Sequence, residues 1–103
     1  MEASVETPAG VMNKRVHLVY SGRVQGVGFR LTAEELARSL GVVGWIKNLR
    51  DGRVELMAEG DESVLAKFLD QLRTGPMRNF IKQVDITWGE WTGEFEEFQI
   101  RYF

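Results

Sequence analysis

The sequence contains no cysteine, a single histidine and only two prolines among its 103 residues. The lack of cysteine excludes disulfides, thiol catalysis and cysteine-based metal sites, and it fits a reducing compartment, so we expect a cytoplasmic protein. One histidine without an HExxH or similar spacing does not predict a metal site. No apolar run approaches the roughly 20 residues of a membrane-spanning helix, and the N-terminus lacks a signal-peptide core, so we expect no membrane association.

The sequence also has no excess of charge of one sign. Thirteen Lys and Arg stand against fifteen Asp and Glu, which makes the formal net charge −2. The two signs are interspersed, so there is no basic stretch of the kind that binds nucleic acid or an anionic membrane. The length predicts one domain, and the 44% of hydrophobic residues is enough for one core.

Hydrophobic periodicity is present from Arg15 onward and absent before it. Residues 1–13 contain Pro8 and Gly10 and show no pattern, which predicts a flexible N-terminal tail followed by one domain over residues 14–103. Alternation and apolar runs predict strands over residues 16–21, 42–48, 53–59, 81–88 and 95–103. Helical spacing predicts two buried stripes: Ala33, Leu36, Ala37 and Leu40, and then Val64, Leu65, Phe68, Leu69 and Leu72.

Local signals mark where these elements begin and end. Asp51-Gly52 predicts a β-hairpin, Asp61 can cap the second helix, Gly41 can end the first, and Gly75-Pro76 can stop the second. The order is βαββαβ with an extra strand near the C-terminus. It predicts an α+β fold, a ferredoxin-like sandwich with an antiparallel sheet and two helices on one face. The late aromatic residues are expected to pack in the core or at the sheet edge: Phe80, Trp88, Trp91, Phe95, Phe98, Tyr102 and Phe103.

The most informative segment runs from Gly22 to Arg30 and reads GRVQGVGFR. Its three glycines allow positive φ and close approach to a ligand, and Arg30 follows where the helical pattern begins. A strand, a glycine-rich loop, an arginine and a helix start in this order predict a pocket for a phosphate or a similar dianion. No Gly-Lys-Ser/Thr follows, so the loop is not a nucleotide P-loop. Taken alone, the loop is also compatible with a tight connection carrying a solvated arginine.

Three later segments accompany this loop: WIKN at residues 45–48, DGRVE at residues 51–55, and TGEFxxF at residues 92–98. Together with the loop they resemble the acylphosphatase family, in order and at matching spacings from about Val16 to Tyr102. The resemblance implies a ferredoxin-like fold and hydrolysis of the carboxyl–phosphate bond of acyl phosphates. The products are a carboxylate and inorganic phosphate, and no metal or cofactor takes part.

The resemblance also assigns residues to this reaction. The family's phosphate-binding arginine falls on Arg30 and its water-positioning asparagine on Asn48, so both are predicted to be catalytic. The phosphate-binding cradle falls on the backbone amides of Gln25, Gly26, Val27, Gly28 and Phe29. The chemistry is consistent, because a carboxylate is a good leaving group and needs no general acid, which leaves positioning and charge stabilisation to the protein. Considered by itself, Asn48 fits a turn residue before Asp51-Gly52 better than a catalytic residue.

One departure and two alternatives accompany this hypothesis. Family members often carry an aromatic residue and then Thr at the positions of Thr32 and Ala33, and loss of that pattern would reduce activity if the Thr orders the site. A non-catalytic module that binds phosphate or acyl phosphate is the first alternative. Nucleic-acid binding is a weaker one, because the acidic balance and the lack of an aromatic RNP-like run count against it. We expect a monomer with a small-molecule substrate.

Overall fold

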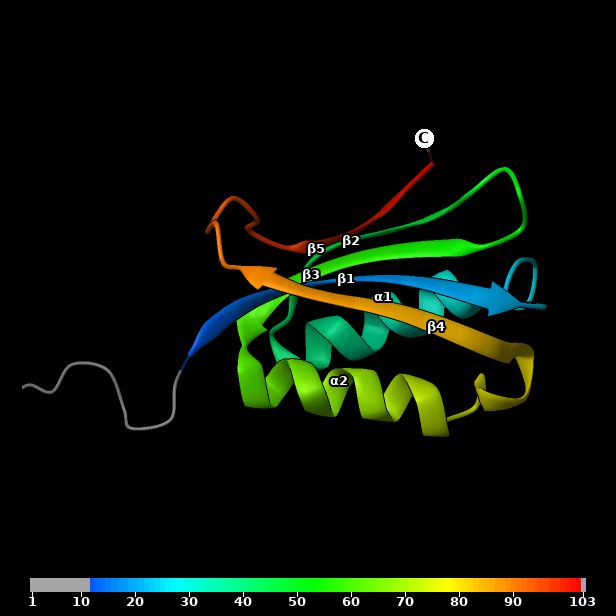
Figure 1. The fold of residues 1–103 in the computed structure, drawn as a ribbon, viewed down its shortest axis with the longest axis horizontal. Coiled ribbons are helices and arrows are strands. Elements are labelled where there is room, and N and C mark those ends of the chain that lie inside the picture. Colours follow the sequence, from blue (N-terminus) through cyan, green and yellow to red (C-terminus); the bar gives the residue numbers. More distant parts are fainter. Residues whose placement is uncertain (1–11, 103) are drawn as a thin grey trace, which may run out of the picture.

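The computed structural model describes residues 12–102 as one sheet with both helices on the same face (Figure 1). The predicted ferredoxin-like α+β fold is confirmed, including the order of its elements. These elements are β1 (Asn13–Gly22), α1 (Phe29–Leu40), β2 (Val43–Asn48), β3 (Val54–Asp61), α2 (Glu62–Thr74), a short 3-10 helix (Arg78–Phe80), β4 (Ile81–Glu90) and β5 (Phe98–Arg101).

The sheet has five strands in the order β4-β1-β3-β2-β5. The prediction of a purely antiparallel sheet was wrong, because β5 pairs parallel to β2, with Ile46 opposite Ile100. The reason lies in the connection: β4 runs antiparallel to β1 and ends beside the start of β1, where Lys14 pairs with Glu90. Residues 91–97 then cross to the far edge at that same end of the sheet, where β2 begins. A strand that enters there has to run in the direction of β2.

The two helices begin and end close to where their local signals placed them. Gly41 ends α1 in the left-handed region at φ 76°, and Asp61 caps α2 by accepting a hydrogen bond from the Val64 amide at 3.4 Å. Their apolar stripes pack on the helix-covered face of the sheet. The buried core residues on the helices are Phe29, Ala33, Ala37, Leu65, Phe68 and Leu72, and those on the strands are Val16, Leu18, Tyr20, Ile46, Val54, Leu56, Ala58 and Phe98.

The predictions for the two ends of the chain have different outcomes. The predicted tail of residues 1–13 lies outside the described residues except for its last two, and β1 begins at Asn13. The strand predicted over residues 95–103 is shorter, at Phe98–Arg101. Within residues 12–102, neither helix has the length and apolar character needed to cross a bilayer.

A buried carboxylate fixes the crossing between β4 and β5. Glu59 on β3 is fully buried, and it accepts hydrogen bonds from the Arg15 Nε at 2.7 Å, the Thr92 amide at 2.9 Å and the Gly93 amide at 3.0 Å. Glu94 also pairs with Arg15. Burial by itself would raise the pKa of Glu59, but the hydrogen bonds from Arg15, Thr92 and Gly93 outweigh it and lower the pKa below its ordinary value. The TGE segment at residues 92–94 is therefore held by a buried carboxylate of the sheet.

Replacing this carboxylate is expected to destabilise the fold and change its response to pH. Glu59→Gln leaves Arg15 without its buried partner, so we expect the free energy of unfolding at pH 7 to fall by about 3 kcal/mol. Because the folded-state pKa is lowered, the stabilisation from ionised Glu59 is present above its unfolded pKa of about 4.3 and is lost as pH falls through the lower folded value. Urea denaturation between pH 3 and 7 measures both effects, with the exposed Glu96→Gln as control. A pH profile for Glu59→Gln that parallels wild type would contradict this account.

Candidate active site

The loop between β1 and α1 depends on two glycines. Gly26 and Gly28 have φ of 77° and 85°, in the left-handed region that other residues rarely adopt. A Cβ built at either position would meet no atom within 4 Å, so backbone conformation and not crowding makes glycine necessary there. These two glycines let the backbone change direction twice in the loop before the helix begins.

Helix α1 begins from this loop without a capping side chain. Gly28 is its N-cap, and the first helical hydrogen bond runs from the Thr32 amide to the Gly28 carbonyl oxygen at 3.0 Å. The backbone N–H groups of residues 29–31 therefore have no partner inside the helix. Its first turn contains no acidic side chain, so the positive end of the helix dipole is not neutralised there. Such a helix start is suited to binding an anion.

A cavity of about 290 Å³ lies over this helix start. It brings Arg30, from the first turn of α1, together with Asn48, the last residue of β2. Of the predicted loop residues, Gly26, Gly28 and Phe29 also line the cavity, and Gln25 and Val27 do not. The remaining lining residues are Val24, Leu31, Ile100 and Tyr102. The structure thus places both predicted catalytic residues on one cavity.

Arg30 is the cation of this cavity. No carboxylate within residues 12–102 forms an ion pair with it. Its guanidinium carbon instead lies 5.2 Å from the centre of the Tyr102 ring, within the range of a cation–π interaction. The ring limits the directions in which the guanidinium can point, and its charge stays available for an anion over the loop.

Asn48 presents a buried acceptor that no group of residues 12–102 satisfies. Its side-chain oxygen is shielded from solvent and accepts no hydrogen bond from any group of residues 12–102. Buried polar atoms normally have a partner, and one left without it costs free energy unless it serves a ligand or an ordered water. This observation argues against a structural role for Asn48 in the turn. It favours a role in which the Asn48 oxygen accepts a hydrogen bond from a water or ligand bound in the cavity.

Gln25 joins the loop to the turn that follows Asn48. Its Nε2 donates to the Leu49 carbonyl oxygen at 2.7 Å and to the Arg53 carbonyl oxygen at 2.9 Å. The loop and the β2–β3 turn lie at the same end of the sheet (Figure 1). The Gln25 side chain thus has a structural role, because it couples the position of Asn48 to that of the loop.

We expect Gln25→Ala to lower kcat of the hydrolysis that the sequence predicts by roughly tenfold, because small displacements of positioned groups are costly. The lost hydrogen bonds should lower the free energy of unfolding by about 1–2 kcal/mol. Steady-state kinetics and urea denaturation check the two values. Gln83→Ala is the matched control, since the Gln83 side chain is exposed and donates to Asp85 on the same strand. Unchanged kcat in Gln25→Ala would show that the loop holds Asn48 by other contacts.

Tyr102 is the residue of this site that the sequence did not reveal. It was predicted to pack in the core or at the edge, but its side chain is 75% exposed and lies against Arg30. The parallel register ends with Arg101 opposite Lys47, so Tyr102, which follows β5, reaches the cavity that Asn48 lines at the end of β2. This neighbourhood follows only from the pairing of β5 with β2, which the sequence pattern did not predict.

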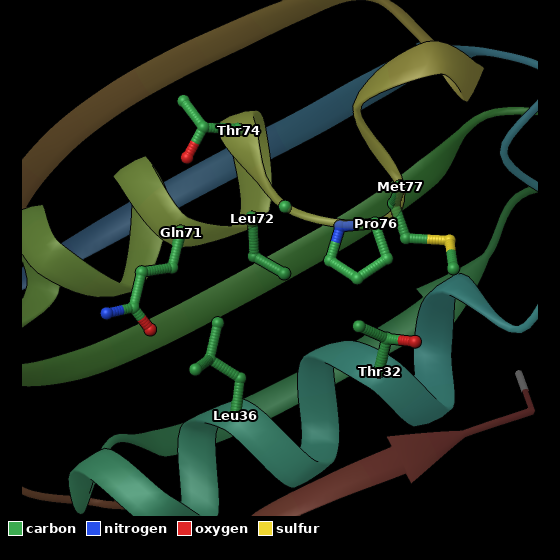
Figure 2. Close-up of a pocket in the computed structure, with 8 residues that line it drawn as sticks. Thr32, Leu36, Gln71, Leu72, Thr74, Pro76 and Met77 are labelled. Atoms are coloured by element: carbon green, nitrogen blue, oxygen red, sulfur yellow. The ribbon is translucent and has the colours of Figure 1, made fainter.

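The departure at residues 32 and 33 lies away from the cavity. Ala33 is fully buried, and Thr32 faces a cleft between the helices that Leu36, Leu72 and Met77 also line (Figure 2). Neither residue lines the cavity that holds Arg30 and Asn48. The altered order of residues therefore leaves the side chains around the helix start in place, and its effect on activity stays a prediction.

The chain is similar to acylphosphatases over nearly all of this domain. Residues 16–100 match the family model described as Acylphosphatase. A protein of Roseiflexus sp. (strain RS-1) named acylphosphatase is 45% identical over 86 residues, which cover 84% of this chain and 92% of the relative. An acylphosphatase of Methylococcus capsulatus is 46% identical over 87 residues, 84% of this chain and 95% of the relative. The crystal structure of acylphosphatase from Bacillus subtilis, at 34% identity, superposes with a TM-score of 0.81 over 88% of this chain and 100% of that one.

Proposed function

The chain belongs to the acylphosphatase family, and we propose that it hydrolyses the carboxyl–phosphate bond of acyl phosphates with Arg30 and Asn48 as its catalytic residues. Family membership and the names of relatives more than 40% identical support hydrolysis over the alternative of a non-catalytic binding module. The observation that carries the residue assignment is the cavity itself. At a helix start without a capping side chain it is lined by Arg30 and Asn48, and within residues 12–102 Arg30 has no ion-pair partner and the Asn48 oxygen no hydrogen-bond donor.

In this proposal the phosphoryl group lies over the loop from Gln25 to Phe29. Backbone N–H groups of the loop and of the first helical turn donate to its oxygens, and the Arg30 guanidinium grips two of them at once. In the transition state, charge spreads over the equatorial oxygens of the phosphoryl group. Donors fixed in place before the reaction stabilise that charge without reorganising, which is the largest contribution the protein makes to rate.

Asn48 positions the attacking water. Its side-chain oxygen accepts a hydrogen bond from the water and directs a water lone pair at the phosphorus, in line with the bond to the acyl oxygen. As the new P–O bond forms, the bond to the acyl oxygen breaks and its electron pair leaves with the carboxylate. The amide of Asn48 is too weakly basic to remove a proton, so the proton of the water passes to the phosphate product or to solvent.

Two further expectations belong to this proposal. We propose that the protein acts as a monomer on a small-molecule substrate. A cytoplasmic location, and a reaction without nucleic acid or membrane, remain predictions from the composition of the sequence.

Hydrolysis of benzoyl phosphate by the wild-type protein in the presence of EDTA tests this proposal. We expect multiple turnovers that EDTA does not inhibit, since the proposed chemistry uses only a guanidinium, an amide and backbone N–H groups. Inorganic phosphate, as a product that fits the same cradle, should inhibit competitively. Binding of phosphate without measurable turnover would replace the enzyme with the binding module.

A further inference from the structure

The catalytic cavity does not end at the phosphate cradle. It shares Leu31, Ile100 and Tyr102 with a wider groove between α1 and β5. Beyond these three residues the groove is lined by polar side chains: Glu34, Arg38, Glu97 and Gln99. The same three residues therefore form both the outer wall of the catalytic cavity and the entrance of the groove.

This shared wall differs in chemistry from the rest of the cavity. The cradle consists of backbone N–H groups, Arg30 and Asn48, whereas Leu31 is 53% exposed and Tyr102 is 75% exposed. Ile100, on β5, is half-buried and lines the cavity together with Leu31 from the first turn of α1. An exposed leucine and tyrosine at a catalytic cavity offer apolar surface that a substrate can cover, and covering it is favourable.

We infer that this wall, defined as Leu31, Ile100 and Tyr102, binds the acyl half of the substrate and makes the protein selective for compact apolar acyl groups. The inference rests on the proposed function. With the phosphoryl group on the cradle, the acyl half has to extend out of the cavity, and this wall lies on that path. An aromatic or branched acyl group covers it, while the methyl group of acetyl phosphate leaves most of it exposed.

The outer part of the groove limits how far the apolar region reaches. Arg38 pairs with Glu34 across 3.3 Å, and Glu97 and Gln99 face the same groove. A long alkyl chain would have to lie along these polar groups and gain little from them. The wall therefore selects a group about the size of one aromatic ring and not an extended fatty acyl chain.

The ratio of kcat/KM for benzoyl phosphate to that for acetyl phosphate tests the inference. We expect a ratio of roughly ten or more in wild type, because the aromatic ring buries more apolar surface in the transition state than a methyl group. Leu31→Ala and Tyr102→Ala should each lower the ratio several-fold by slowing benzoyl phosphate more than acetyl phosphate. Tyr102→Phe keeps the ring and should keep the ratio. Ile86→Ala, which shortens a side chain 50% exposed on β4, is the matched control for Leu31.

The inhibition constant of inorganic phosphate separates acyl binding from damage to the cradle. It should stay within about twofold of wild type in Leu31→Ala, which leaves Arg30 and its ring partner intact. Equal losses for both substrates in Leu31→Ala and Tyr102→Ala, with an unchanged ratio, would overturn the inference and leave the proposed function standing. Hydrolysis of neither substrate by wild type would overturn both.

Discussion

Arg30→Ala is expected to lower kcat/KM for benzoyl phosphate by about 10²-fold or more, the range seen when one preorganised transition-state donor is removed. Arg30 is the only Lys or Arg among the described residues that line the cavity, so no neighbouring side chain can replace its charge. Arg30→Lys should also be strongly impaired, because an ammonium group lacks the planar two-point contact that a guanidinium makes with phosphate oxygens. Steady-state kinetics give the loss, and phosphate inhibition should weaken in both variants.

The control for this experiment comes from the same loop. Arg23 is exposed and does not line the cavity, so Arg23→Ala removes an equal charge and should keep kcat/KM within about threefold of wild type, a change attributable to long-range electrostatics. Equal losses in the two variants would indicate that the net charge of the loop, and not a contact from Arg30, attracts the substrate. Near-normal turnover in a folded Arg30→Ala protein would remove Arg30 from the mechanism.

Asn48→Ala is expected to lower kcat by about 10²-fold while KM and phosphate inhibition change little. The variant loses the group that orients the water, and the phosphate cradle stays intact. The effect on the free energy of unfolding should be the opposite of that expected when a hydrogen-bonded asparagine is replaced. Because the Asn48 oxygen has no partner among residues 12–102, its removal should leave the free energy of unfolding unchanged or raise it.

This pairing of kinetics with stability distinguishes a catalytic asparagine from a structural one. If Asn48 stabilised the turn, Asn48→Ala would lower the free energy of unfolding by about 1 kcal/mol, which is the usual cost of losing a capping hydrogen bond. Asn79→Ala, at an exposed position next to β4, is the control for the substitution itself. A variant that is destabilised and yet retains most of its kcat would assign Asn48 to the turn.

The sequence by itself determined the secondary elements and the location of the glycine-rich loop before α1. These features depend on neighbours close in the chain: the 3.6-residue and two-residue periods, the Asp61 and Gly41 caps, and the glycines that reach positive φ at residues 26 and 28. Arg30 and Asn48 were predicted as a pair by resemblance to the family, and their roles remain proposals. No local pattern shows that β1–α1 and the end of β2 meet in space.

Only the tertiary structure decided the contacts between segments far apart in the sequence. The chain leaves β4 at the end of the sheet where β2 begins, so β5 has to run parallel to β2. The residue after β5, Tyr102, thereby reaches the cavity that Arg30 and Asn48 line. In the sequence, Glu59 is one carboxylate among several on a predicted strand. In the fold, the segment that connects β4 to β5 covers it and donates hydrogen bonds to it. Whether a carboxylate is buried or a tyrosine is exposed depends on which distant segment packs against it. The periodicity of one strand shows which face is apolar, but it does not show which segment will cover that face.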